Sequence, residues 1–358
     1  MIDWNSSMSV TYEYYVVDPK TWKDTAKLGV VKSCSITRDS EAETLCSASI
    51  DVNELVGECY IRAYLVAIQN GITEKHPLGA FLVQTPSSSF NGRSRTVTME
   101  AYSPLLELKE KYPPIGYSLP KGEDIMDVAY RLIRELLRSP VVKNKCNNED
   151  YAYLLNDFVS DPSDPWLIYL KDLVANAKYD LDLDEMSRVI FVPRQDTTAL
   201  QPVCTFDDSN SSILLPEITM DHDLYMIPNV VEVICSTGLE KHYARVVNDD
   251  PNSPTSTVRR GREIVHRVTN PELVGNNPSV KQIDSYAENL LKEKSTVEYT
   301  ISYTHGFHPR VRPGVCVRLN YERAGLTDIK CKVISQTIKC ATACLVTEKA
   351  VFTQKLWR

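Results

Sequence analysis

The sequence predicts a mixed β and α+β protein. We expect two small antiparallel β-barrels, with an α+β module between them and a helix-containing insertion in the second barrel. Three observations predict this class: strand-like alternation of apolar and polar residues at both ends of the chain, helical spacing of apolar residues in the middle, and a polar excursion and a helix that interrupt the later strands. A chain of 358 residues is also long enough for two to four domains.

Residues 1–110 have the pattern of the first β-barrel domain. In Cys46–Val52, apolar residues alternate with serine and aspartate, as in a half-buried strand. Asn70-Gly71 and Asn91-Gly92 predict two-residue hairpin turns, because Asn and Gly tolerate positive φ. Several short strands joined by tight turns indicate a small antiparallel barrel or sandwich.

Residues 111–200 are predicted to form the α+β module. Apolar residues at helical spacing predict an amphipathic helix over about 122–138. A second helix is expected to have Ser163 or Asp164 as its N-cap and Pro165 at its first helical position. A hairpin follows, formed by the predicted strands 179–183 and 189–192.

The second barrel is predicted to comprise residues 201–242 and 297–358. Val230–Cys235 is expected to be one of its strands. Residues 243–296 are expected to form an insertion of loop and helix, with the helix running from about Pro278 to Lys294.

Composition excludes several classes of function. The net charge of −7 argues against a protein that binds nucleic acid by neutralising phosphates. No apolar run approaches the roughly 20 residues that span a bilayer, so no membrane association is expected. The first residues lack the basic and apolar parts of a signal peptide, which predicts synthesis in a reducing cytoplasm.

The ten cysteines are predicted to be free thiols buried in strands. No C-x-x-C pair is present, and Cys340 and Cys344 have three residues between them. Cysteine packs as a small apolar residue in such positions. Five cysteines alternate with polar neighbours in this way: Cys34, Cys46, Cys59, Cys235 and Cys331.

An acidic cluster resembles a calcium loop only superficially. Its members are Asp180, Asp182, Asp184 and Glu185. An EF-hand needs Gly at its sixth position and Glu at its twelfth, but Glu185 and Phe191 stand there. A strand with a solvated acidic face explains the pattern better. A catalytic pair formed by Asp182 and Glu185 would need an enclosed cleft, which the sequence does not indicate.

Histidines provide two incomplete metal motifs. His305 and His308 flank Gly306-Phe307, and Asp221-His222-Asp223 is a second candidate. Each set has too few ligands for a zinc site, so turn residues are the preferred interpretation. The sequence also lacks G-x-S-x-G, P-loop and G-x-G-x-x-G patterns. We therefore predict no catalytic, cofactor-binding or metal-binding residues.

A basic cluster has two interpretations that the sequence leaves open. It consists of Arg259, Arg260, Arg262, His266 and Arg267, beside a loop rich in Ser and Pro. It is either a solvated strand edge or hairpin, or an electrostatic contact to an acidic neighbouring subunit.

The order of these elements resembles the baseplate hub proteins of tailed bacteriophages. The resemblance covers most of the chain and rests on turns and folds rather than on chemistry. The segments that carry it are His76–Leu82, Thr85-Pro86, Asn91-Gly92, Ala101–Leu105, Trp166, Ile227–Val233, Asn248–Pro251, Ser253–Ser256, Tyr286-Ala287 and Val311–Val317.

This resemblance implies a non-enzymatic virion protein without a cofactor. The implied assembly is a homotrimer whose six barrels form a pseudo-sixfold ring, adapting a hexameric tail tube to a threefold central spike. The implied partners are a tail tube or distal tail protein, a spike or needle protein, and further a tape measure protein and other baseplate proteins. The alternatives are a β-rich cell-wall or carbohydrate-active hydrolase and a receptor-binding tail module.

Overall fold

The computed structural model describes residues 2–29, 31–53, 57–195, 199–209, 212–221, 223–237, 240–271 and 279–357. The chain divides into two compact units, and each is considered by itself. The first unit contains residues 1–218 and 303–350, and the second contains 219–302 and 351–358. Asn210, Ser211 and Pro278, which lie in a predicted loop and at a predicted helix start, are outside the described residues.

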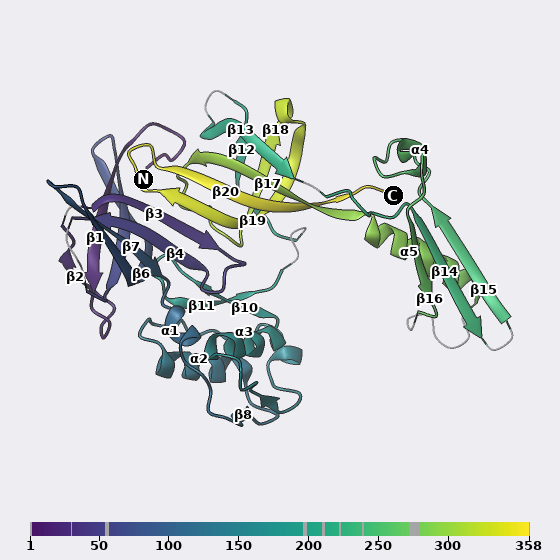
Figure 1. Cartoon of the computed structure of the whole chain (residues 1–358), viewed down its shortest axis with the longest axis horizontal. Helices are drawn as coiled ribbons and strands as arrows, with labels where there is room; N and C mark the ends of the chain where they lie inside the picture. Colours follow the sequence, from purple (N-terminus) through teal and green to yellow (C-terminus); the bar gives the residue numbers. More distant parts are fainter. Residues whose placement is uncertain are drawn as a thin grey trace. The chain divides into compact units, whose positions relative to one another are not determined.

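The N-terminal strands form an antiparallel group in the order β3-β4-β7-β6-β5-β1-β2 (Figure 1). The turn at Asn70-Gly71 has two residues, as predicted, because Gln69 pairs with Ile72. The turn at Asn91-Gly92 has four residues instead, because Phe90 pairs with Arg95. The Asn91 carboxamide oxygen accepts the Ser94 N–H and stabilises this longer turn. The strands are β1 (Ser9–Val17), β2 (Asp24–Lys27), β3 (Val31–Asp39), β4 (Cys46–Val52), β5 (Tyr60–Gln69), β6 (Ile72–Phe90) and β7 (Arg95–Tyr102).

A second group of strands comes from the later part of the chain and joins the first group through one ladder. β19 pairs antiparallel with β3, from Ser335 opposite Asp39 to Lys339 opposite Ser35. The two predicted β-barrels are therefore parts of one 13-stranded sheet in the described residues. The later strands are β12 (Pro202–Asp207), β13 (Leu214–Asp221), β17 (Thr296–Gly306), β18 (Cys316–Tyr321), β19 (Leu326–Lys339) and β20 (Leu345–Lys355), with a 3₁₀ turn η3 (Glu322–Ala324).

The α+β module has the predicted helices and hairpin. The second long helix begins at Trp166, one residue later than expected, because Pro165 is extended (φ −68°, ψ 163°) and forms the N-cap itself. The Ser163 hydroxyl bonds to Asp161 rather than capping the helix. The module comprises α1 (Leu106–Lys109), β8 (Ser118–Leu119), α2 (Ile125–Leu136), η1 (Glu149–Tyr151), β9 (Phe158–Val159), α3 (Trp166–Asn176), β10 (Tyr179–Leu183) and β11 (Val189–Pro193).

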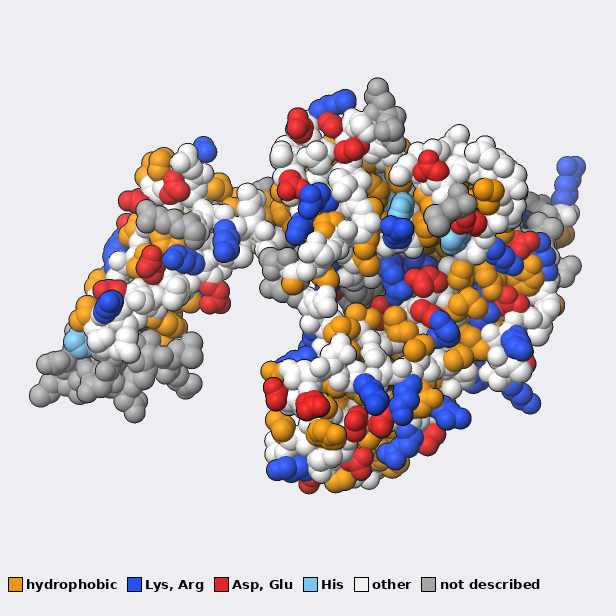
Figure 2. Space-filling model, turned by 180° about the vertical axis from the view of Figure 1, so that it is seen from behind, with side chains coloured by type: hydrophobic (Ala, Val, Ile, Leu, Met, Phe, Trp, Pro, Cys, Tyr) orange, Lys and Arg blue, Asp and Glu red, His pale blue; other side chains and the backbone are white. Residues whose placement is uncertain are grey.

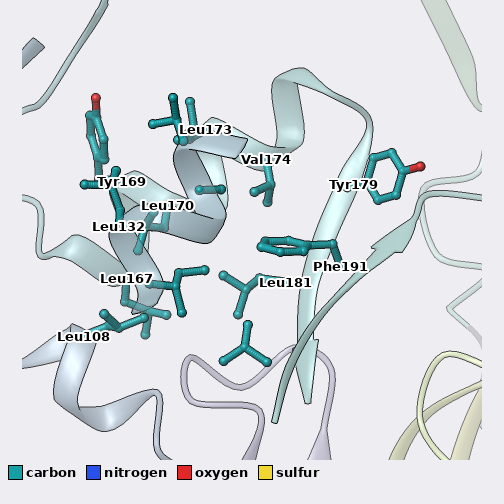
Figure 3. Packing of buried hydrophobic residues seen from close by; sticks show 14 of the residues in the cluster. Leu108, Leu132, Leu167, Tyr169, Leu170, Leu173, Val174, Tyr179, Leu181 and Phe191 are labelled. Carbon is teal, nitrogen blue, oxygen red and sulfur yellow. The ribbon is translucent and has the colours of Figure 1, made fainter. Parts of the chain in front are cut away.

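The core of this module is almost wholly apolar. Figure 3 shows side chains of α3, such as Leu170 and Val174, packed towards Leu132 of α2 and Phe191 of β11. Leu170 and Val174 are completely buried. Burying each such side chain contributes about 1.5–3 kcal/mol, so this core accounts for the helical periodicity in the sequence.

The second unit contains a three-stranded sheet in the order β15-β14-β16, with one helix packed on it. Val231 and Val233 of β14 pack against Ile283 and Ala287 of the helix. Ser279 and Gln282 form a capping box at the helix start. The elements are β14 (Val230–Thr237), β15 (Glu240–Val247), α4 (Thr257–Arg260), β16 (Val265–Thr269) and α5 (Val280–Lys294).

This sheet corrects one expectation. Val230–Cys235 was predicted to belong to the second barrel, but β14 pairs antiparallel with β15 and parallel with β16. Both edges of β14 are paired with neighbouring strands, and α5 packs on one face of this sheet. β14 therefore belongs to the insertion, because the apolar face of the inserted helix needs an apolar sheet to pack on.

Candidate functional site

The acidic cluster lies beside a cavity of about 610 Å³ within the first unit. Asp182 and Glu185 both bind Arg312, with N–O distances of 2.8 Å each. The Arg312 guanidinium also donates to the Leu183 carbonyl over 2.5 Å. The acidic residues alternate along a strand as predicted, but Asp182 and Glu185 are ion-paired rather than simply solvated. They hold the β10–β11 hairpin against the loop that precedes β18.

Charge and burial are balanced at this cluster. Burial lowers the pKa of Arg312, but Asp182 and Glu185 more than offset it, so the pKa is raised overall. Burial raises the pKa of Glu185, and the guanidinium of Arg312 reverses this, leaving that pKa below its ordinary value. The remaining acids of the cluster have their own partners, Arg194 for Asp180 and Arg188 for Asp184. The arrangement stabilises a contact and supplies no free acid–base pair.

Arg38 lines the same cavity and leads into a buried polar chain. Its guanidinium donates to the Gln336 side chain over 3.0 Å and to the Leu78 carbonyl over 2.9 Å. The Gln336 amide donates in turn to Glu348, over 2.7 Å, and to the Val311 carbonyl, over 2.8 Å. The chain of contacts crosses from β3 to β19 and on to β20.

His305 completes this chain at the far end. Its Nε2 lies 3.1 Å from Glu348 Oε1, and its Nδ1 lies 2.5 Å from the Gly306 carbonyl oxygen. Both His305 and Glu348 are fully buried. Among the described residues, Glu348 Oε2 and the Tyr303 hydroxyl are buried without a hydrogen-bond partner. We name the set Arg38, Gln336, Glu348 and His305 the polar seam.

The two incomplete histidine motifs were interpreted as turn residues, and in the structure His305 and His308 have different hydrogen-bond partners. The Nδ1 atom of His308 accepts a hydrogen bond from the Arg310 N–H over 3.3 Å. Burial, with His305 and Arg310 adding to it, lowers the pKa of His308. Within the described part of the chain, no group of three or more His, Cys, Asp or Glu side chains is placed to hold a metal ion. His222 of the second motif lies outside the described residues.

The basic cluster is divided among contacts within its own unit. Arg260 donates to the carbonyl oxygens of Ile227 and Leu224, over 2.8 and 2.6 Å. Arg259 donates to the Pro251 carbonyl over 3.1 Å. These bonds position loops and favour the local interpretation for both residues.

Arg267 of the same cluster takes part in an ion-pair network on the sheet of the second unit. It binds Glu232 over 2.7 Å, and Arg245 also approaches that carboxylate, over 3.4 Å. The Arg267 and Tyr243 hydrogen bonds lower the pKa of Glu232. On the face that Figure 2 shows, Lys and Arg side chains are intermixed with Asp and Glu rather than gathered into one basic surface.

All ten cysteines have free thiols, as the sequence predicts. Of the five singled out for strand alternation, Cys34, Cys235 and Cys331 are buried, while Cys46 and Cys59 are half-buried. Burial raises the pKa of Cys331 to about 12 and that of Cys46 to about 11, which makes these thiols poor nucleophiles.

Sequence reasoning missed every partner in the polar seam, although a signal was present. Glu348 lies between Val346 and Ala350, at the inward phase of its strand. Gln336 and His305 likewise lie at inward phases, beside Ile338 and Tyr303. A polar residue at an apolar phase is the pattern of a buried hydrogen-bonded group.

Comparison with solved structures identifies the fold. The chain is similar to the tail protein from Neisseria meningitidis MC58, with a TM-score of 0.59 and 12% identity, covering 97% of this chain and 98% of that one. It is similarly close to the 43 kDa tail protein of prophage MuSo2 from Shewanella oneidensis, with a TM-score of 0.59 and 10% identity, covering 96% and 98%. At these identities the likeness establishes a common fold, a tail-protein-like mixture of mostly antiparallel sheets with few helices.

Sequence comparison adds no family. No protein-family model matches the chain, and no curated protein matches it. The described helices include none that is long and apolar enough to cross a membrane.

Proposed function

We propose that this chain is a structural, non-enzymatic protein of a phage-type tail. In this proposal it forms the homotrimeric hub of the baseplate, a pseudo-sixfold ring that adapts a hexameric tail tube to a threefold central spike. The observation that supports it most is the common fold with two tail proteins over nearly the full length of each chain.

The arrangement of strands supports the hub in particular. A trimer reproduces sixfold symmetry only if each chain presents two comparable β domains. Here an antiparallel group of strands and a second group, antiparallel except for the parallel β12–β18 pair, are joined through the β3–β19 ladder within one unit. The polar seam and the Arg312 cluster fix this join and the α+β module beside it. A join held by these contacts suits the proposed ring, because the two groups of strands in each chain must keep fixed positions in it.

In this proposal different regions of the chain have different roles in the assembly. Residues 1–110 and the later strands would form the ring, while residues 111–200 and the insertion 243–296, now with β14 added, would contact other baseplate proteins. The proposed partners are a tail tube or distal tail protein, a central spike or needle, and a tape measure protein. The protein would be made in the host cytoplasm and reside in the virion tail, with no membrane and no sequence-specific nucleic acid as partner.

The mass of the purified chain in solution tests this proposal. Light scattering across a hundredfold range of concentration is expected to give three times the chain mass of 40.5 kDa, and negative-stain averages of the same sample should show a ring of six similar lobes. A monomer at every concentration, both alone and with a candidate central spike protein, contradicts the hub. Turnover of peptidoglycan or binding of glycans by the same sample would favour the hydrolase or the receptor-binding module instead.

A further inference from the structure

Two cysteines face each other at the end of the ladder that joins the two groups of strands. The register of β3 and β19 runs from Ser335 opposite Asp39 to Lys339 opposite Ser35, so the next pair is Cys340 opposite Cys34. The Cys340 N–H donates to the Cys34 carbonyl oxygen over 3.0 Å, which continues the ladder to this pair. The Cys34 thiol is also the largest influence on the pKa of Cys340, which it raises.

The spacing of this pair is compatible with a disulfide. Directly opposed residues of a hydrogen-bonded antiparallel pair have Cα atoms about 5.5 Å apart, and disulfides bridge Cα atoms about 4.4–6.8 Å apart. Cys340 is half-buried and is followed by the turn 341–344, whose residues Ala341, Thr342 and Ala343 are exposed. A small oxidant therefore reaches Cys340 first, and Cys34 lies opposite it across the ladder.

We propose that Cys34 and Cys340 form a latent disulfide, which closes across the β3–β19 ladder when the protein meets a low-molecular-weight disulfide such as oxidised glutathione. The Cys340 thiol loses its proton, and the thiolate attacks one sulfur of the small disulfide, releasing one small thiol. The Cys34 thiolate then attacks the sulfur of Cys340 and releases the second small thiol. Two protein thiols are oxidised and one small disulfide is reduced to two thiols.

The surroundings make this reaction slow and the product labile. The neighbouring Cys34 thiol and burial raise the pKa of Cys340, so little thiolate forms near neutral pH. Opposed Cβ atoms in a ladder are about 4.5–5.5 Å apart, whereas a disulfide prefers about 3.8 Å. Closing the bond strains the end of the ladder, and strained disulfides are easily reduced. In a reducing cytoplasm both thiols remain free, and the cross-link forms only in an oxidising medium.

A third thiol provides the internal control. Cys344 lies at the other end of the turn and is buried against the same core as Cys34. Burial raises its pKa to about 11. Cys344 is outside the β3–β19 register, so the inference assigns the bond to Cys340 and not to Cys344. The inference does not depend on the proposed tail function, because it uses only the ladder within one chain.

Peptide mapping of the folded full-length chain tests the assignment. The protein is incubated with oxidised glutathione at pH 7 and at pH 9, free thiols are alkylated, and the chain is digested with trypsin. Trypsin releases Cys34 in the peptide 33–38 and Cys340 together with Cys344 in the peptide 340–349. We expect these peptides to be linked in the wild type, and the linkage should be more than about tenfold faster at pH 9 than at pH 7, because the thiolate fraction rises with pH. The link should persist in Cys344→Ser and be absent in Cys340→Ser.

Thermal unfolding supplies a second measurement, made first on the wild type. The oxidised wild type should unfold roughly 5 °C above the reduced protein, because the bond closes a very long loop, and dithiothreitol should remove the difference. The variant Cys146→Ser, which alters a thiol of the α+β module, should keep the shift. Alkylated Cys34 after full oxidation, a link that survives in Cys340→Ser, or a link that is lost in Cys344→Ser would each overturn the proposal.

Discussion

The core of the α+β module and three of the four residues of the polar seam, Gln336, Glu348 and His305, are similarly buried but are built in opposite ways. The module core relies on apolar side chains such as Leu170 and Leu173. The seam holds a carboxylate, an imidazole and a carboxamide at positions where the neighbouring strands would accept apolar residues. An apolar core tolerates substitutions that change the shape of a side chain but keep its volume. A buried network of polar groups is strongly destabilised when one member loses its hydrogen-bond partner. The seam therefore specifies which strands join, and the module core supplies stability.

The largest effect is expected from Glu348→Leu in the polar seam. Leucine is similar in size but accepts no hydrogen bond, so His305 Nε2 and the Gln336 amide lose their shared acceptor. Removing one partner of a buried pair costs about 3–5 kcal/mol. Glu348→Gln, which retains an acceptor, is the matched control and should cost less. Thermal unfolding measures both, and a Leu variant as stable as the wild type would refute the contrast drawn above.

A somewhat smaller loss is expected from Leu170→Ala in the module core. Leu170 is completely buried, and its truncation leaves a cavity. Such changes cost about 2–5 kcal/mol, depending on how far the site collapses. Leu170→Met preserves volume and should cost below about 1.5 kcal/mol. If the conservative Met variant were as damaging as Ala, the module core would be no more tolerant than the seam. Denaturant unfolding followed by near-ultraviolet circular dichroism distinguishes these outcomes.

Arg312→Gln is expected to have a moderate effect that depends on pH. The side chain is 20% exposed and holds Asp182 and Glu185, so its loss should cost about 1–2 kcal/mol after allowance for solvent screening. The pKa of Glu185 is below its ordinary value in the folded protein. Its contribution is therefore present above a pH of about 4.5 and disappears as pH falls through the folded-state pKa. Unfolding temperatures measured from pH 7 to pH 3 should fall more steeply in the wild type than in Arg312→Gln. Parallel curves would show that the ion pair contributes nothing.

The smallest effect is expected from Arg267→Ala in the second unit. Its side chain is 62% exposed, and Arg245 remains beside Glu232 when Arg267 is lost. Salt should screen what remains of this network, so the decrease in unfolding temperature should shrink further at 0.5 M NaCl. Arg262→Ala provides the comparison from the same basic cluster. A large decrease for Arg267→Ala that salt does not change would indicate that this pair behaves like the buried seam.

Local structure was predictable from the sequence, and long-range pairing was not. Helical spacing predicted α2 and α5 within three residues at each end, and strand alternation predicted β10 and β11. The position of β14 was missed because its nearly continuous apolar run fits a barrel as well as a small sheet covered by a helix.

The acidic cluster shows the same limit at the level of a site. The strand that carries Asp182 was predicted, but its partner Arg312 lies 130 residues further along the chain. Nothing in the spacing of charges connects the two. The seam residues were detectable one by one, as polar residues at inward phases, but the sequence gives no means of pairing Gln336 with Arg38.

The β3–β19 ladder also has a consequence for how the protein is made. Arg38 and Gln336, which meet across it, are separated by 298 residues. At a synthesis rate on the order of 10 residues per second, β3 waits roughly half a minute on the ribosome before its partner strand exists. Throughout that interval its edge is open to any other nascent strand, and polysomes bring copies of the same edge close together. Slower translation of the region between β3 and β19 should therefore lower the yield of native protein.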